Sequence, residues 1–205
     1  MKALKILKEL ALEKAPGPTP SFSQLDLARA IEIIDSEHIG RNKLAARLGL
    51  GEGTTRTLID RLLDAQLIKI SKLGCELTRN GRSILNELNA KLGAKKMIER
   101  SSVTVGKYNL GILVKGAADR IKSGIEQRDA AVRAGASGAV TFVFRRGELI
   151  MPLPAGSATK ERKDVTAAIS DAFQPHENDV IIIAGGDSER HAEEGAMAAA
   201  WVIIE

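Results

Sequence analysis

Residues 39–82, IGRNKLAARLGLGEGTTRTLIDRLLDAQLIKISKLGCELTRNGR, carry the pattern on which the interpretation of the whole chain depends. Within them, residues 41–48 repeat leucine and alanine at helical spacing and predict a short helix. Three glycines fall in the next five residues and predict a turn. The leucines and isoleucine of residues 54–66 again have helical spacing, so they predict a second helix directly after the turn.

Two short segments of alternating character follow the second helix. Residues 67–71 and 75–78 alternate around a glycine-containing turn, which predicts a two-stranded hairpin. A further helix is expected to begin at Asn80, with apolar positions that continue to Leu92. Helix, turn, helix and hairpin in this order form a winged helix-turn-helix, whose second helix enters the major groove of duplex DNA.

Residues 39–82 resemble the DNA-binding domain of many prokaryotic winged-helix transcription regulators, and Leu77, Thr78 and Gly81 match the L-T-x-x-G at the end of the wing. The second half of the chain, including NDVIIIAGGDSERHAEEGAMAAAWVII, is similar to the C-terminal domain of a family of archaeal winged-helix proteins. The resemblance extends over nearly the full chain from about residue 20. It implies an archaeal transcription regulator, and it brings no catalytic or ligand-binding residues, because the C-terminal domain of that family has no settled function.

The charges of the chain are distributed unevenly. The net charge is +4, but residues 1–100 contain 18 Lys and Arg against 12 Asp and Glu, whereas residues 101–205 contain 12 against 14. Residues 41–82 alone contain 9 basic and 4 acidic side chains. This concentration favours a polyanionic partner for the N-terminal half. Aromatic residues make up only 3% of the chain, too few for single-stranded nucleic acid to be bound mainly by base stacking.

Eight side chains on the predicted DNA-binding elements are candidate contacts. If the leucines of residues 54–66 face the core, threonine and arginine side chains of that helix lie on the opposite face, where they can reach base edges. Basic residues of the preceding helix and of the wing are placed to contact phosphates. Asp60 and Asp64 oppose phosphate unless the helix enters by its N-terminal end, and solvated surface charges remain the alternative interpretation. The candidates are Arg41, Lys43, Thr54, Arg56, Thr57, Arg61, Lys69 and Lys72.

The second half predicts strand, helix, strand, strand, helix, strand and helix over residues 103–201. This order is typical of a two-layer α/β sandwich of ferredoxin-like or related type, so the chain as a whole belongs to the α+β class. We expect an N-terminal helix and proline-rich linker over 1–20, the winged helix-turn-helix DNA-binding domain over 21–98, and an α+β effector-binding or dimerisation domain over 99–205.

Two segments of the second half are candidate sites. A polar cluster at the start of a helix is a candidate effector pocket or dimer contact, with an exposed ion-paired helix face as the alternative. The glycine turn at Gly185 precedes a helix N-terminus, but the acidic residues there oppose an anion, and Asp187 or Ser188 is expected to act as a helix cap. The cluster comprises Lys122, Ser123, Glu126, Arg128 and Asp129.

Several chemistries find no support in the sequence. The three histidines lack metal-ligand spacing, and Cys75 is expected to be a small core residue. Neither a phosphate-binding loop nor a nucleophile elbow occurs, so we expect no metal, no cofactor and no enzymatic activity. No apolar run approaches the roughly 18 residues of a membrane span and no signal peptide is evident, which favours a cytoplasmic protein without membrane contact.

The sequence therefore predicts a sequence-specific transcription regulator that binds double-stranded DNA. Its C-terminal domain is expected to sense a small-molecule effector or to mediate association, and a homodimer is expected because paired half-sites need paired domains. The alternative is a winged-helix module for protein or RNA interaction without sequence-specific DNA binding. An enzyme of unrecognised type in residues 101–205 is the least supported possibility.

Overall fold

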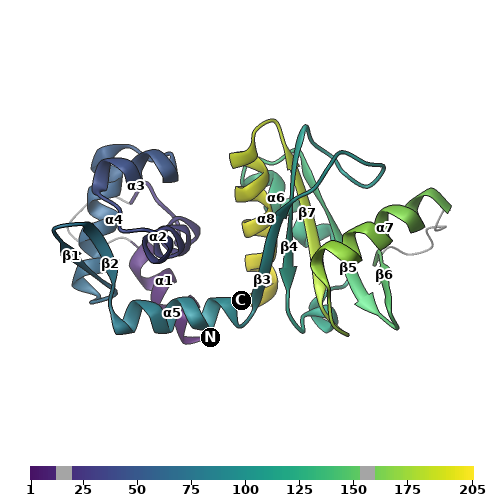
Figure 1. Cartoon of the computed structure of the whole chain (residues 1–205), viewed down its shortest axis with the longest axis horizontal. Coiled ribbons are helices and arrows are strands. Elements are labelled where there is room, and N and C mark those ends of the chain that lie inside the picture. Colours follow the sequence, from purple (N-terminus) through teal and green to yellow (C-terminus); the bar gives the residue numbers. More distant parts are fainter. Residues whose placement is uncertain (13–19, 153–159) are drawn as a thin grey trace. The chain divides into compact units, whose positions relative to one another are not determined.

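The computed structural model describes residues 1–12, 20–152 and 160–205, and the chain divides into two compact units, Met1–Asn89 and Ala90–Glu205 (Figure 1). The proline-rich linker predicted within residues 1–20 falls mainly on residues 13–19, which lie outside the described residues. The elements of the N-terminal unit are α1 (Lys2–Ala11), α2 (Gln24–Ser36), α3 (Arg41–Leu48), α4 (Glu52–Asp64), β1 (Ile68–Ser71), β2 (Gly74–Leu77) and α5 (Arg79–Asn89).

The N-terminal unit has the predicted winged helix-turn-helix order. Gly49 ends α3 in the left-handed conformation with φ 64°, which glycine adopts without steric cost, and α4 begins after its N-cap Gly51. The strands β1 and β2 pair antiparallel to form the wing. The backbone of Ile39 bridges Cys75 on the other side of β2, and burial raises the pKa of the Cys75 thiol, as fits a core residue.

The core of the N-terminal unit is formed by the apolar faces of its helices. The helix α1 packs against α2 and α5, and α3 packs against α4. Burying several leucine and isoleucine side chains from different helices against one another supplies the main driving force for this fold. The fully buried large residues of the unit are Leu7, Leu27, Ile31, Ile39, Leu44, Leu48, Leu58, Leu62 and Leu88.

The C-terminal unit is built on one antiparallel five-stranded sheet. The elements of this unit are β3 (Leu92–Met97), β4 (Tyr108–Val114), the 3-10 helix η1 (Ala118–Arg120), α6 (Ile125–Arg133), β5 (Gly138–Arg145), β6 (Glu148–Ile150), α7 (Lys160–Phe173), β7 (Val180–Gly186) and α8 (Glu189–Ile204). The strand order is β3-β4-β7-β5-β6. The central strand β7 is buried along its whole length, as its uninterrupted apolar run predicts.

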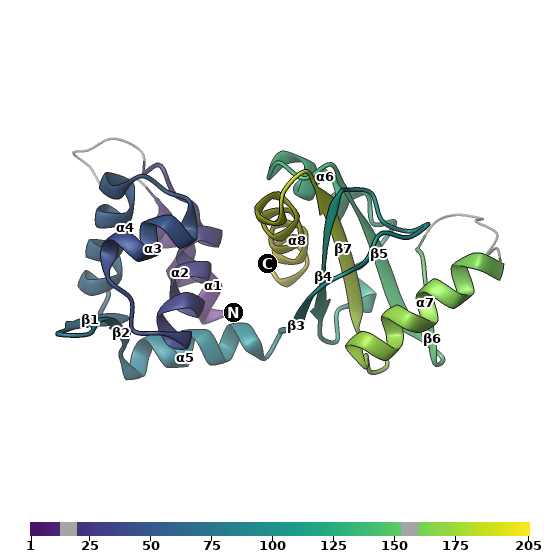
Figure 2. The same ribbon diagram turned by 45° about the horizontal axis from the view of Figure 1, so that its top comes forward.

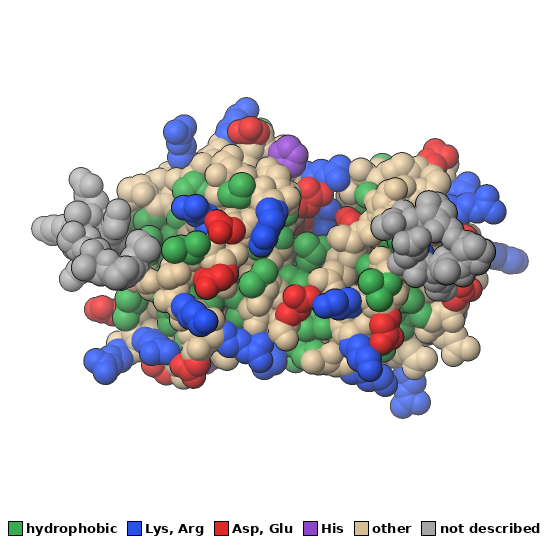
Figure 3. Space-filling model, turned by 180° about the vertical axis from the view of Figure 1, so that it is seen from behind, with side chains coloured by type: hydrophobic (Ala, Val, Ile, Leu, Met, Phe, Trp, Pro, Cys, Tyr) green, Lys and Arg blue, Asp and Glu red, His purple; other side chains and the backbone are tan. Residues whose placement is uncertain are grey.

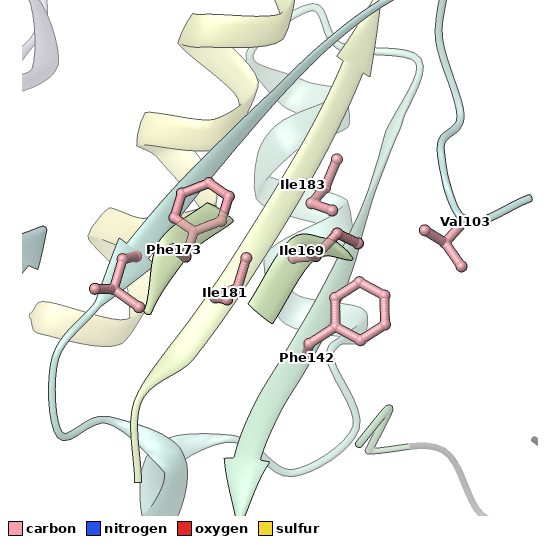
Figure 4. Packing of buried hydrophobic residues seen from close by; sticks show 7 residues of the cluster. Val103, Phe142, Ile169, Phe173, Ile181 and Ile183 are labelled. Atoms are coloured by element: carbon pink, nitrogen blue, oxygen red, sulfur yellow. The ribbon is translucent and has the colours of Figure 1, made fainter. Parts of the chain in front are cut away.

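Helices cover both faces of this sheet (Figure 2). On one face α6 and α8 pack against each other and against β7. A Cβ atom added to Gly195 of α8 would lie 2.4 Å from the Cβ atom of Ala136, just after α6, 3.3 Å from that of Ala184 in β7 and 3.5 Å from that of Ala131 in α6. On the other face, Ile169 and Phe173 of α7 belong to a buried cluster with side chains of β4, β5 and β7 (Figure 4). The α+β class is therefore confirmed, and α7 adds a third layer to the two that the sequence predicts.

The division between the units lies earlier in the chain than the sequence predicts. The helix α5 ends at Asn89, and Leu92, expected on the apolar stripe of this helix, instead belongs to β3, where it pairs with Val114 of β4. The boundary between the two units along the chain lies between Asn89 and Ala90 rather than near residue 98. The cause is long-range strand pairing, which overrides the local helical spacing of the leucines.

Candidate nucleic-acid interface

The recognition helix α4 presents a short polar face at its N-terminal end. Leu58, Ile59 and Leu62 are buried, whereas Arg56 and Thr57 are exposed on the first two turns and Thr54 is half-buried. The Thr57 hydroxyl donates to the carbonyl oxygen of Gly53 at 3.2 Å, a bond that occupies its proton and leaves the oxygen able to accept. Arg56 and Thr57 are therefore available to a base edge, beside the acidic Glu52, which is also exposed on the first turn.

Two acidic residues bound this polar face on its C-terminal side. Asp60 and Asp64 are exposed on the later turns of α4, as the sequence predicts. Their charges disfavour close approach of phosphates along the whole length of the helix. A DNA duplex that binds α4 therefore contacts its first two turns, where the positive end of the helix dipole also lies.

The structure corrects the predicted role of Arg61. This residue is only 7% exposed, and its Nη1 atom donates to the carbonyl oxygen of Leu10 at 2.6 Å and also to that of Leu12. Its guanidinium also lies 5.5 Å from the ring centroid of Phe22. The guanidinium is therefore bound within the N-terminal unit by carbonyl groups at the end of α1, and it is not placed to read a base.

The helix α3 places two cations at its N-terminus. Arg41 and Lys43 are exposed on its first turn, and the N-cap residue Gly40 supplies no side-chain cap for the first backbone N–H groups. Unpaired N–H groups and nearby cations together favour an anion such as a phosphate. Because α3 contacts α4 and α4 contacts β1, these cations, the recognition helix and the wing belong to neighbouring elements.

The two wing lysines differ in their surroundings. The Nζ atom of Lys69 lies 3.0 Å from a carboxylate oxygen of Glu76, whereas Lys72, at the tip of the hairpin, is exposed and forms no ion pair within the described residues. A hydrogen bond from Ser71, with a further bond and charge attraction from Lys69, lowers the pKa of Glu76. Glu76 is consequently ionised near neutral pH and competes with phosphate for Lys69.

Two more exposed arginines lie on α5, and they are not among the residues predicted from the sequence. Arg79 and Arg82 occupy its first turns, three residues apart and therefore on one side of the helix. Figure 3 shows the N-terminal unit on the right, with Lys and Arg side chains gathered along its lower edge, where α5 runs in Figure 1. The available signal was their position around the L-T-x-x-G motif within the basic stretch of residues 41–82.

The polar cluster predicted in the second half lies at the start of α6. Lys122 and Ser123 precede the helix, and the Ser123 hydroxyl accepts from the backbone N–H of Ile125 at 3.4 Å. Arg128 and Asp129 are exposed and form an ion pair of 3.5 Å. Glu126 is also exposed. These contacts are those of an exposed ion-paired helix face, the alternative interpretation of this cluster.

The remaining observations concern a helix cap, metal ligands and membrane spans. The Ser188 hydroxyl accepts from the backbone N–H of His191 at 3.1 Å, so Ser188 is the N-cap of α8, as expected. Within residues 1–12, 20–152 and 160–205, no group of three His, Cys, Asp or Glu side chains is placed to hold a metal ion. In the same part of the chain, no helix has the length and apolar character needed to cross a membrane.

The comparisons with known proteins divide the chain in a similar way. The family described as "CggR N-terminal DNA binding domain" matches residues 27–92, and the family described as "Domain of unknown function (DUF4443)" matches residues 105–203. The solved structure titled "Hypothetical protein PH0730 from Pyrococcus horikoshii OT3" is similar, with a TM-score of 0.72 and 24% identity over 89% of this chain and 93% of that chain. No curated protein matches the sequence. The fold is therefore a helical DNA-binding domain followed by an α+β domain.

Proposed function

We propose that this protein is a sequence-specific transcription regulator that binds double-stranded DNA through its N-terminal unit. The observation that carries the proposal is the exposed pair Arg56 and Thr57 on the first two turns of α4, within a unit that matches a DNA-binding domain. An arginine can donate two hydrogen bonds to O6 and N7 of guanine, and a threonine can contact a base edge or a thymine methyl group. In this mode α4 enters the major groove by its N-terminal end, which keeps Asp60 and Asp64 away from the phosphates.

Residues outside α4 hold the duplex without reading it. Arg41 and Lys43, beside the unpaired N–H groups of α3, contact the phosphates that flank the major groove. Lys72 at the wing tip contacts a more distant phosphate, and Lys69 does so when it exchanges its partner Glu76 for a phosphate. Such contacts add affinity that depends steeply on salt and is the same for all sequences.

The C-terminal unit serves the regulator by sensing a small-molecule effector or by joining two copies into a homodimer. Support for the dimer is general: a dimeric reader binds two half-sites about one helical turn apart and gains specificity from both. The proposal assigns the protein no catalytic step and no cofactor. A regulator that binds the DNA of a prokaryotic cell acts in the cytoplasm.

One observation favours an interaction module as the second candidate function. The wing carries two strongly exposed apolar side chains, Ile70 at 64% and Leu73 at 70% exposure. Exposed apolar side chains that form a contiguous patch are typical of surfaces that contact another macromolecule. In this function the winged helix contacts a protein or a structured RNA, and the acidic residues of α4 are tolerated.

Selection of bound duplexes from a random pool, performed with the full chain, tests the proposal. We expect one enriched motif, and Arg56→Ala is expected to lose about 1–3 kcal/mol of discrimination at one base position. Arg133→Ala, which removes an exposed arginine of α6, is the matched control and leaves the motif and affinity unchanged. Failure to enrich a motif, together with a shallow salt dependence, contradicts the proposal and favours the interaction module.

A further inference from the structure

An open groove of about 690 Å³ lies in the N-terminal unit between the wing and α5. Apart from Leu77, all the residues that line it are polar or basic, and none is acidic. The groove is distinct from the polar face of α4, since no residue of α4 lines it. Its polar lining consists of Lys69, Thr78, Arg79, Arg82, Ser83 and Asn86.

One face of α5 forms the long wall of this groove. Arg79, Arg82, Ser83 and Asn86 are exposed and follow one another at positions i, i+3, i+4 and i+7, so they lie on one side of the helix. The opposite side, which includes Leu88, is buried in the core of the unit. At 1.5 Å per residue the polar wall is about 10 Å long, the rise of about three base pairs of duplex DNA.

The start of α5 is fixed in place at one end of the groove. The Thr78 hydroxyl donates to the carbonyl oxygen of Gln66 at 2.7 Å and accepts from the backbone N–H of Gly81 at 3.2 Å. This arrangement holds the N-terminus of α5, the positive end of its dipole, beside the basic side chains. The wall is therefore anchored by Thr78 at the end that carries the helix N-terminus.

The three cations of the groove are only partly neutralised by the protein. Arg82 lies 3.8 Å from Asp35 and donates to the carbonyl oxygen of Leu77 at 3.4 Å, both long contacts. Lys69 is paired with Glu76. Arg79 forms no ion pair with the described residues, so its charge is available to an anion.

We propose that this groove binds the phosphodiester backbone of the DNA beyond the base pairs that α4 reads. The inference rests on the proposed function, and it names a second contact surface for the same duplex. Three features favour a backbone over a small phosphate compound: the groove is open, its polar wall is extended, and no aromatic side chain lines it for stacking a base. The strand β1, which contributes Lys69 to the groove, also contacts α4, so the groove and the polar face of α4 belong to neighbouring elements.

Two duplexes that share the selected motif separate this contact from base reading. The short duplex ends at the motif, and the long duplex adds about one helical turn, roughly 10 base pairs, on each side. With the full chain, Arg79→Gln is expected to weaken binding to the long duplex about 3–10-fold and to leave the short duplex unaffected. The slope of log K against log salt is expected to fall by about 0.9 for each phosphate that the variant no longer neutralises. The matched control Arg133→Gln removes the same charge from α6 and changes neither duplex.

Four other results would contradict the inference that the groove binds the DNA backbone. Equal affinity of Arg79→Gln and the wild type for the long duplex overturns this inference while the proposed function stands, provided that Arg56→Ala still loses its base discrimination. Equal losses on both duplexes also overturn it, because Arg79 then acts within the motif or on the fold, and thermal melting of the variant tells these two apart. If the wild type binds neither duplex, the proposed function and this inference both fail. A saturable shift of the Ser83 and Asn86 amide resonances with inorganic phosphate, at constant ionic strength, identifies a small-anion site instead.

Discussion

The Nη1 atom of Arg61 donates a hydrogen bond of 2.6 Å to the carbonyl oxygen of Leu10. Leu10 lies in the last turn of α1, where carbonyl groups have no partner within the helix. A guanidinium that reaches these carbonyls both satisfies them and places a positive charge at the negative end of the α1 dipole. Arg61 thus connects the recognition helix α4 to α1 and is a structural residue of the N-terminal unit.

Replacing Arg61 is therefore expected to reduce stability rather than base recognition. Arg61→Ala removes a charged donor from two carbonyl groups and its contact with the Phe22 ring, and should lower the free energy of unfolding by about 2–4 kcal/mol. Chemical denaturation of the full chain measures this loss. The exposed Arg56→Ala serves as the comparison and should change stability by less than about 0.5 kcal/mol. A stable Arg61→Ala variant with altered base preference would contradict the assignment.

The two glycines Gly81 and Gly53 predict opposite effects of the same substitution. A Cβ atom at Gly81 would lie 2.1 Å from the carbonyl oxygen of Leu67, so Gly81→Ala forces the start of α5 away from the backbone of Leu67. Overpacking of this kind costs about 1–3 kcal/mol. A Cβ atom at Gly53, inside α4, meets nothing within 4 Å, and Gly53→Ala should stabilise the unit by up to about 1 kcal/mol through helix propensity. Thermal melting of both variants measures these changes in stability. A lower melting temperature of Gly53→Ala would show that the backbone of α4 is more constrained than the open space around Gly53 indicates.

Lys72 at the tip of the wing is expected to act on all DNA sequences alike. It is exposed and forms no ion pair within the described residues, so its charge is available to a phosphate but has no fixed geometry for reading a base. Lys72→Ala should weaken specific and random duplexes by the same factor and lower the salt slope by about 0.9. Titrations of both duplexes at several salt concentrations check this. A loss confined to the specific duplex would instead assign Lys72 to base recognition.

Glu76 gives the wing a predicted response to acid. The hydrogen bond from Ser71 and the proximity of Lys69 hold the pKa of Glu76 below the ordinary range of a glutamic acid. A group whose pKa is lower in the folded state stabilises the fold above its unfolded pKa, about 4.3, and this contribution disappears as the pH falls through the lowered value. Following the Glu76 carboxyl carbon by NMR should give a lowered midpoint. In Lys69→Gln the midpoint should move upward, and an unchanged midpoint would show that the ion pair does not form in solution.

The sequence predicts the elements of this protein better than it predicts their partners. Local signals are sufficient for the helix-turn-helix and for the hairpin turn at Arg146 and Gly147, whose φ values of 54° and 79° suit a tight turn. They also identify Ser188 as a cap. Helical spacing could not show that Arg61 has a partner, because the carbonyl of Leu10 lies 51 residues away in the sequence.

Two further differences have the same origin. Leu92 has helical spacing but pairs with Val114, a contact that only the folded sheet defines. Ser23 and Asp26 form the capping box of α2, although Ser21 and Gln24 have the same spacing, because two equivalent serines lie within three residues of each other. Of the candidate site, exposure of Arg56, Thr57 and Lys72 follows from local periodicity and turn chemistry. The groove beside Arg79 depends on how α5 packs against the wing, and no local pattern contains that information.

Asp179 predicts a strong dependence of the C-terminal unit on one buried carboxylate. It is only 4% exposed, its Oδ1 atom accepts from the backbone N–H of Gly116 at 2.8 Å, and its Oδ2 atom accepts from that of His176 at 2.9 Å. Asp179→Ala leaves both N–H groups without their carboxylate acceptor. Hydrogen bonds to a charged group contribute about 1.5–3 kcal/mol, and both donors belong to exposed residues that water can reach, so a loss of about 1.5–3 kcal/mol in total is expected. Chemical denaturation followed by the fluorescence of Trp201 on α8, the single tryptophan of the chain, reports on this unit. The exposed Asp187→Ala should remain within about 0.5 kcal/mol of the wild type. Similar small effects in both variants would show that water replaces the carboxylate at Gly116 and His176, and that Asp179 does not hold these two loops together.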